Sequence, residues 1–476
     1  MFDWLLRHVL LRGLPSETAE ACIRHPEVSA LLRFRFAYLF AFHAPVLVPL
    51  LELLGGQPSG PGDPSLSVLS LGLASLTMVL ADVPTGFYAD RHGSKAALRL
   101  GLLATNVIMM GFLALGVVRA LLPASSGLLG LGAAVVLLLE ASIGVSLALL
   151  SGADTVLFLQ VAKRSGIPGL LHSSFEGVGS SIRYLGTMVA VLIGSLLYDL
   201  ATRLLPEVAV RTAVQSGLFG LTVLAEVVAL FQLAKLHDDH SPVRRPGLRE
   251  LAAGFAAILR FPRFFAEMWL LSMAAAVALF AVYLVQSPLS RLATQLASQV
   301  PWLWPTYTLV AVLGYYACSV GSQRYARHRG ESLAVVPQRS LGLAGLSWLL
   351  LLLLPLCLWL FDGSALRSGI LLGGAAVLCL AYNYIRGFIE PYSAATLIRF
   401  MQEQGGQVPV SVISGFNSLK RGAHFGYSAV FYLLQQRSQR TDPDARLSQS
   451  LTWLALGFLL VCLPVLGSLR SPKTAE

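Results

Sequence analysis

Long runs of apolar residues constrain this chain more than any other feature of its sequence. A helix that crosses the hydrocarbon core of a bilayer needs about 20 mostly apolar residues. Twelve such runs follow one another, and we expect a membrane-spanning helix in each of them: 36–54, 66–87, 96–118, 129–150, 182–200, 212–234, 264–287, 302–322, 340–361, 368–389, 410–433 and 448–466. The sequence therefore predicts an all-α integral membrane protein.

The composition of the chain excludes several other classes of protein. Charged residues make up 13% of the 476 residues and hydrophobic residues 55%, whereas a soluble domain carries about 25% charged residues. A soluble domain and a disordered chain are therefore excluded. The net charge of +10 does not indicate nucleic-acid binding, because a Lys/Arg excess is typical of the cytoplasmic loops of a membrane protein. The five cysteines lack the spacing of metal ligands or of a disulfide scaffold.

The twelve expected spans divide into two sets of six. We expect a cytoplasmic amphipathic segment at 1–35, a first six-helix half at 36–235, a basic linker at 236–263, a second six-helix half at 264–468 and a tail at 469–476. In this arrangement most of the 35 Lys and Arg residues fall on the side of the linker and the termini. That side is expected to be cytoplasmic, since positive charge accumulates there.

One loop between two expected spans carries a motif with fixed spacing. The sequence from Asp82 to Lys95 reads Asp-Val-Pro-Thr-Gly-Phe-Tyr-Ala-Asp-Arg-His-Gly-Ser-Lys. It resembles the cytoplasmic signature of the major facilitator superfamily, Gly-x-x-x-Asp-Arg-x-Gly-Arg-Arg/Lys, although Ser94 stands where that family prefers Arg. Five positions match this signature: Gly86, Asp90, Arg91, Gly93 and Lys95.

The resemblance extends to a bacterial subgroup of that superfamily, which includes proposed drug exporters. The Pro-Thr-Gly-x-x-Ala-Asp-Arg stretch is similar to this subgroup, and so, more weakly, are 151–154 and the Arg386-Gly-x-x-Glu390-Pro sequence. The resemblance implies two pseudo-symmetric six-helix halves in a bacterial inner (plasma) membrane. It also implies transport by alternating access, with a substrate site between the halves.

The residues of the loop motif have physical reasons of their own. Glycines allow two helices joined by a tight turn to approach closely. Asp90 is expected to accept hydrogen bonds from the positive amino-terminal end of a neighbouring helix, the one that begins at about residue 410. Arg91 and Lys95 are expected to pair with Asp90 or to hold the loop at the lipid headgroups. We expect the motif to act as a latch on the cytoplasmic side.

An internal repeat at an offset of 237 residues supports two homologous halves. Ser181-Ile-Arg183 aligns with Ser418-Leu-Lys420, and Ala89 and Gly93 align with Ala326 and Gly330. The second loop lacks the acidic residue of the first, because Arg327 stands opposite Asp90.

Ionisable residues inside the expected spans are candidates for function, because each costs about 2.5–3.5 kcal/mol at the bilayer centre on insertion scales. Glu140 is the first candidate for a proton-carrying or cation-recognising carboxylate; a structural hydrogen bond is the alternative. Arg386 and Glu390 lie one helical turn apart, where an internal ion pair is expected. Asp82 is expected to make a gate contact, and His43 is either a titrating group or a hydrogen-bonded structural histidine.

The sequence favours a secondary transporter over an enzyme. We expect proton-coupled export of a small amphipathic or apolar solute, by a monomer that needs no cofactor or metal; its partners are the solute, protons and the lipid bilayer. No phosphate-binding Gly-x-x-x-x-Gly-Lys-Ser/Thr loop occurs, which argues against an ATP-driven pump. A membrane enzyme would need a clustered nucleophile and base or a set of metal ligands, and the sequence indicates no such cluster at a membrane face. The alternative that stays open is a transport-inactive scaffold or sensor with the same fold.

Overall fold

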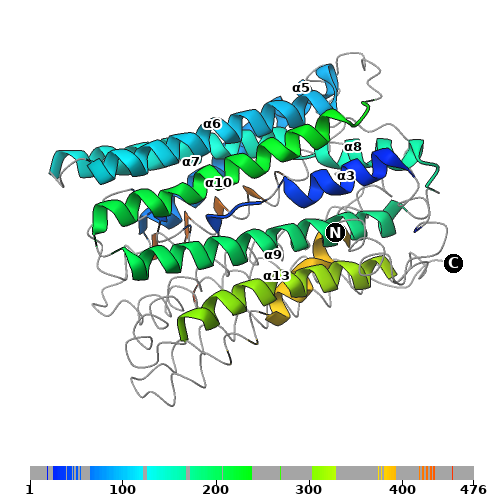
Figure 1. Ribbon diagram of the computed structural model, residues 1–476. Coiled ribbons are helices and arrows are strands. Elements are labelled where there is room, and N and C mark those ends of the chain that lie inside the picture. Colours follow the sequence, from blue (N-terminus) through cyan, green and yellow to red (C-terminus); the bar gives the residue numbers. More distant parts are fainter. Residues whose placement is uncertain are drawn as a thin grey trace.

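The computed structural model describes 25–38, 40–44, 65–121, 126–167, 172–205, 207–238, 303–327 and 380–392, together with isolated residues elsewhere. These residues form long helices that run side by side, without any strand among them (Figure 1). The helices are α3 (Pro26–Ala37), α5 (Ser65–His92), α6 (Ser94–Leu121), α7 (Ser126–Leu150), α8 (Ala153–Arg164), α9 (His172–Leu204), α10 (Val208–Ala234) and α13 (Leu303–Arg327). The segment 380–392 is also helical.

Five segments of this bundle are long and apolar enough to cross a membrane, and they coincide with the second to sixth expected spans. The expected spans at 96–118 and 212–234 lie inside α6 and α10, and the span at 302–322 lies inside α13 apart from its first residue. The span expected at 182–200 is too short, because α9 already begins at His172. The added turns contain Glu176, which is buried and ion-paired. A search for runs of apolar residues stops at such a charge, although the helix continues through it.

The first half is organised around the short helix α3. Its residues Val28, Leu31 and Phe34 are fully buried, and they belong to one apolar cluster with residues of α6, α8, α9 and α10. This helix crosses the expected boundary at residue 35, where Arg35 is buried and paired with carboxylates inside the bundle. Around it α5 packs against α7, and α6 packs against α10 (Figure 1).

One end of the bundle carries the loop motif, and we call it the motif end. Here the chain turns from α5 into α6 at Gly93, whose φ of 93° favours glycine. Arg164, at the end of α8, forms an ion pair with Glu27 of α3 at 3.0 Å. The end of α10 is also here, as its contacts with Lys95 show.

The second half meets the first along α9. Helix α13 lies beside α9 over much of its length (Figure 1), and the helical segment 380–392 lies against α13. Glycines make this last contact possible: a Cβ atom on Gly387 would overlap the backbone of Cys318, and one on Gly321 would overlap the carbonyl oxygen of Tyr384. Such close backbone contact is typical of small residues between membrane helices.

Candidate functional site

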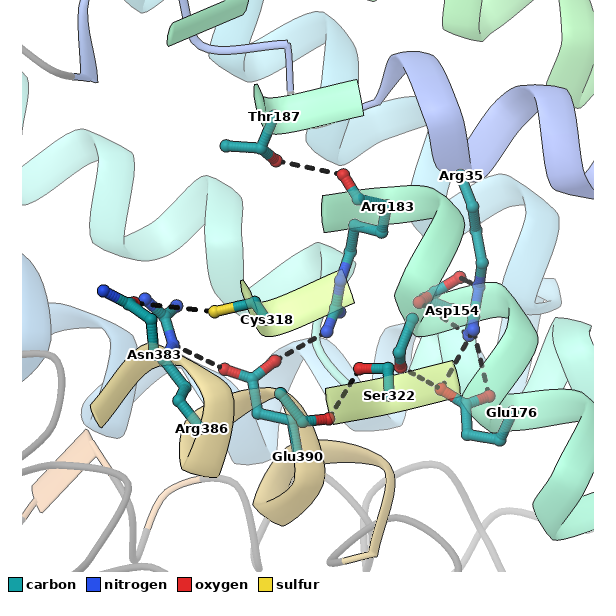
Figure 2. Close-up of polar contacts among 12 residues, drawn as sticks. Arg35, Asp154, Glu176, Arg183, Thr187, Cys318, Ser322, Asn383, Arg386 and Glu390 are labelled. Atoms are coloured by element: carbon teal, nitrogen blue, oxygen red, sulfur yellow. Dashed lines mark hydrogen bonds and ion pairs between the residues drawn. The ribbon is translucent and has the colours of Figure 1, made fainter. Parts of the chain in front are cut away.

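An ion pair joins the two halves where α9 meets the segment 380–392. Arg183 of α9 approaches Glu390 with 2.6 Å between Nη2 and Oε2. The other oxygen of the same carboxylate accepts a hydrogen bond from Nε of Arg386 at 3.2 Å. Glu390 therefore lies between two arginines, one from each half (Figure 2). The pair predicted from the one-turn spacing of Arg386 and Glu390 is present, and Arg183 is a partner that the spacing does not indicate.

An aromatic ring accompanies these arginines. The guanidinium carbon of Arg183 lies 5.3 Å from the ring centre of Tyr184, and that of Arg386 lies 5.9 Å from it. These distances are within the range of cation–π contacts. The side chains of Arg183, Arg386 and Glu390 are 16–18% exposed, so the group is largely but not completely buried.

A second group of charges lies wholly within the first half. Arg35 of α3 donates two hydrogen bonds to Asp154 of α8, at 3.2 and 3.0 Å. Its Nη1 contacts both oxygens of Glu176 in α9, at 2.9 and 3.0 Å (Figure 2). The guanidinium also lies 4.0 Å from the ring centre of Phe158. The Arg35 side chain is 1% exposed, so this is a buried arginine with two carboxylates.

The sequence does not reveal this second group. Arg35 falls in a segment expected to lie outside the membrane, Asp154 is singled out only as part of a weak motif, and Glu176 lies just before an expected span. Asp154 and Glu176 are each more than 100 positions from Arg35 in the sequence, so no local spacing could reveal the group. The available signal is a charge at the edge of an apolar run.

Two hydrogen bonds between the halves follow the internal repeat. Ser181 of α9 contacts Ser319 of α13 at 2.8 Å between the hydroxyl oxygens. Ser418 donates to Oδ2 of Asp82 in α5 at 2.9 Å. The offset of 237 that aligns Ser181 with Ser418 also aligns Asp82 with Ser319. The two bonds are therefore the same contact made twice, once in each direction across the interface.

The other candidate residues lie in the first half. His43 is buried, its Nδ1 lies 3.1 Å from the Thr222 hydroxyl, and its ring stacks on Phe219. These contacts are of the kind expected for the structural alternative, in which the histidine is hydrogen-bonded. Glu140 is 2% exposed, and its Oε1 has no hydrogen-bond partner among the residues that the structure describes. Oε2 of Glu226 is in the same situation.

The loop motif lies at the motif end, where Lys95 makes contacts that the sequence does not predict. Gly86 and Asp90 are buried and Arg91 is exposed. The Lys95 ammonium donates hydrogen bonds to the carbonyl oxygens of Ala234 and Leu236, at the end of α10. A cation is favourable at a helix C-terminus. The helix start expected opposite Asp90, at about residue 410, lies outside the described residues.

Among the described residues no cluster of three or more His, Cys, Asp or Glu side chains has the arrangement of a metal site. What the arrangement can do is electrostatic: it holds two bodies together by ion pairs and hydrogen bonds that break without covalent chemistry.

Comparison with known proteins gives the fold. No protein-family model matches the chain, and no curated protein matches it in sequence. A D-xylose–proton symporter superposes with a TM-score of 0.59 at 12% identity, covering 90% of this chain and 96% of that one. A proton:xylose symporter of the major facilitator superfamily, bound to 6-bromo-6-deoxy-D-glucose, gives 0.61 at 11% identity over 93% and 94%. A human organic anion transporter gives 0.52 at 15% identity over 93% and 100%.

At these identities the likeness shows the fold alone. The chain has the major facilitator fold, an all-α membrane architecture of twelve helices in two six-helix halves. The fold class predicted from the apolar runs and the loop motif is confirmed.

Proposed function

We propose that this chain is a secondary transporter that works by alternating access, and that its two halves separate at the motif end when the site opens inwards. The observation that carries the proposal is the Arg183–Glu390 ion pair, which joins the halves directly at 2.6 Å. Arg183 lies in the first half of α9, which begins at the motif end. An ion pair at that place closes the inner side while the outer side is free to open.

The two repeat-related hydrogen bonds support the same gate. The Ser181–Ser319 and Asp82–Ser418 contacts both join the halves, and they are related by the offset that relates the halves themselves. A pair of equivalent contacts suits a rocking motion about a pseudo-twofold axis, since both break in the same movement. The Ser418 contact of Asp82 supports a gate role for this carboxylate in the proposal. The loop motif, with Asp90 as its latch, adds to this gate in the proposal.

Protons are the proposed coupling ion, and Glu140 is the proposed carrier. Glu140 is buried in a membrane-spanning helix with an oxygen that lacks a hydrogen-bond partner in the described part of the chain. A carboxyl group in such a place is easier to bury when it carries a proton.

The proposed substrate is a small amphipathic or apolar solute, and the proposed direction of transport is outwards. Both rest on the resemblance of the loop motif to the subgroup of proposed drug exporters. The structural neighbours are named for a sugar and for organic anions, so the fold does not select a substrate.

Solute flux in proteoliposomes tests the function. The purified chain is reconstituted, and a panel of neutral, cationic and anionic small solutes is followed with and without a pH gradient. We expect at least one solute to accumulate against its gradient, and only when the pH gradient is present. Absence of flux for the whole panel, in a protein that is monodisperse and thermally stable, would favour the scaffold or sensor instead.

A further inference from the structure

We propose that Glu226 binds the cationic group of an organic solute, beside a break in the first membrane-spanning segment. The ligand class is an amphipathic organic cation, in which a quaternary ammonium or phosphonium group is attached to an apolar body. The inference rests on the proposed function and narrows it, because it assigns a charge to the transported solute. It also gives a role to a buried carboxylate that the proposed gate does not use.

The first expected span, at 36–54, is not one continuous α-helix. Helix α3 ends at Ala37, the described residues 40–44 are not α-helical, and Leu47 is helical again. The Phe40 amide donates to the carbonyl oxygen of Ala37, three residues back, whereas an α-helix uses the residue four back. We call the described residues of 38–44 the break.

Glycines of α9 accommodate the break. A Cβ atom on Gly186 would overlap the carbonyl oxygen of Phe36, and one on Gly194 would overlap that of Phe42. The two carbonyl groups lie near the two ends of the break, and their close approach to α9 requires glycine. Phe40 and Phe42 are partly exposed. The break therefore has an accessible surface inside the expected span, which is typical of irregular backbone that lines a cavity.

Glu226 comes from the face of α10 that contacts this span. Thr222 lies one turn before Glu226, and Ala229 and Leu233 lie one and two turns after it, so all four share one helix face. The Thr222 hydroxyl oxygen accepts a hydrogen bond from the Phe42 amide at 3.2 Å. Ala229 and Leu233 belong to the apolar cluster of α3, beside which α10 lies (Figure 1). Glu226 is between these contacts, at the level where α3 ends and the break begins.

The carboxylate of Glu226 is deep in the membrane and lacks a cation. At 1.5 Å per residue it lies about 12 Å from the end of α10, within a hydrocarbon core about 30 Å thick. Glu226 is 6% exposed, and its Oε2 has no hydrogen-bond partner among the described residues. It also forms no ion pair in the described part of the chain. A buried carboxylate is unfavourable without a cation, which a ligand would supply.

The polar side chains that contact the break are already engaged. Oγ1 of Thr222 accepts from the Phe42 amide, donates to the Leu218 carbonyl at 3.1 Å and lies 3.1 Å from Nδ1 of His43. One hydroxyl hydrogen satisfies all three contacts when Nδ1 of His43 carries a hydrogen and donates. This group of hydrogen bonds is therefore complete without Glu226.

Aromatic rings accompany the carboxylate. The ring centres of Phe40 and Phe42, in the break, are 5.7 Å apart. Phe219 lies two turns before Glu226 on α10, with its ring centre 4.9 Å from that of Phe112. A metal ion such as Ca²⁺ takes six or more oxygen ligands, whereas aromatic faces and one carboxylate suit an organic cation. The surroundings therefore favour an organic cation with an apolar body.

Binding of a probe cation to the full chain in detergent tests the assignment. The probe is tetraphenylphosphonium, and triphenylphosphine oxide is a neutral compound of similar shape. Equilibrium dialysis at pH 8, with a detergent-only chamber as the blank, gives the Kd of each. We expect Glu226→Gln to weaken tetraphenylphosphonium binding at least about tenfold and to leave the Kd of the neutral compound within about twofold. Glu226→Asp, which keeps the charge, should retain more affinity than Glu226→Gln.

Two further variants control for indirect effects. Asp199→Asn makes the same carboxylate-to-amide change on α9, where Asp199 is paired with Arg203, and it should leave the Kd of tetraphenylphosphonium unchanged. Phe40→Leu removes a ring and keeps an apolar side chain. It should weaken binding of the cation about threefold, with little effect on the neutral compound.

A measurement on the wild-type protein replaces the variant if Glu226→Gln does not fold. Dicyclohexylcarbodiimide modifies buried carboxyl groups, and mass spectrometry of the peptides follows the modification of Glu226 and Glu140 separately. Tetraphenylphosphonium at ten times its Kd should slow the modification of Glu226 about tenfold and leave that of Glu140 unchanged.

The outcomes separate the site from the transport function. Equal Kd values for the wild type and Glu226→Gln, no measurable binding to the wild type, or loss of binding in Glu140→Gln alone would each overturn the role of Glu226. Flux of a neutral solute driven by a pH gradient would keep the proposed function even then. Binding that depends on Glu226, without flux of any solute, would keep the site and overturn the transporter.

Discussion

At the scale of single residues, the buried carboxylates of this protein are of two kinds. Glu176 and Glu390 are held by arginines from other parts of the chain. Glu140 and Glu226 each have an oxygen with no hydrogen-bond partner among the described residues. The first kind is suited to hold helices together, whereas the second kind is suited to gain and lose a proton. Sequence position alone does not separate the two kinds, because all four residues lie in or beside apolar runs.

Glu140→Gln tests the coupling role of the unpartnered kind. The amide is isosteric and cannot carry the proton, so flux driven by a pH gradient should fall to background, while exchange of solute at equal pH on both sides continues. Glu226→Gln is the matched comparison, since Glu226 is also buried, on another helix. Gradient-driven flux in Glu140→Gln at the wild-type rate would remove Glu140 from the mechanism.

His172 predicts a pH dependence of stability. It lies before the membrane-spanning part of α9, and its Nε2 is 3.0 Å from the carbonyl oxygen of Ile167. Burial, with a smaller effect of the nearby Lys163, lowers the pKa of His172 below its usual 6.5, although the hydrogen bond with Ile167 acts the other way. The unfolded chain then binds a proton more readily than the folded one, so stability is lost as pH falls through about 6.5.

A comparison with His172→Gln isolates this effect. The melting temperature of the wild type should fall relative to that of the variant between pH 7.5 and 5.5, and the difference should be constant above pH 7.5. A difference between the two proteins that does not change over this range would show that His172 takes up its proton equally in the folded and unfolded states.

At the scale of elements, close glycine contacts fix how the segment 380–392 meets α13. Gly387 has the backbone of Cys318 against it, and the Ser322 hydroxyl donates to its carbonyl oxygen at 2.5 Å. A methyl group there forces the helices apart and moves Arg386 and Glu390 with them. Gly387→Ala should therefore lower the free energy of unfolding by about 1–3 kcal/mol, the usual cost of overpacking.

Gly217→Ala in α10 is the control for this prediction. Nothing lies within 4 Å of a Cβ atom at Gly217, so alanine there should leave stability unchanged or raise it by about 0.5–1 kcal/mol through its better helix propensity. Chemical denaturation in detergent followed by circular dichroism measures both variants. Equal effects at the two positions would mean that the close contact at Gly387 carries no stability.

The elements were largely predictable from the sequence, and the site only in part. Apolar runs located α5, α6, α7, α10 and α13, because these helices bury few charges in their membrane-spanning turns. The apolar runs placed the start of α9 too late and indicated no helix at α3. Arg35 and Glu176 look like surface residues in the sequence, because their charge is visible there and their buried partners are not. The Arg386–Glu390 pair was predictable from spacing along one helix. Arg183 was not, because its partner is 207 positions away.

At the scale of the whole molecule, the internal repeat connects sequence and structure most closely. The offset of 237 was read from short matches in the sequence. It also maps the Ser181–Ser319 contact onto the Ser418–Asp82 contact, which are hydrogen bonds between the halves. Since the equivalent contacts bind different helix pairs, both have to break when the halves rock apart. The central claim is thus mechanical: this interface opens during transport.

A reversible cross-link across the interface tests that claim most directly. In a background without native cysteines, Ser181→Cys/Ser319→Cys places two thiols where hydroxyl oxygens are 2.8 Å apart, and Thr105→Cys/Ser146→Cys does the same within the first half, where the oxygens are 3.1 Å apart. The measurement is the flux of a transported solute in proteoliposomes after oxidation and again after reduction. The account predicts that oxidation stops flux in the first pair, that reduction restores it, and that the second pair transports throughout. Full flux through a protein shown to be cross-linked between Ser181 and Ser319 would contradict it.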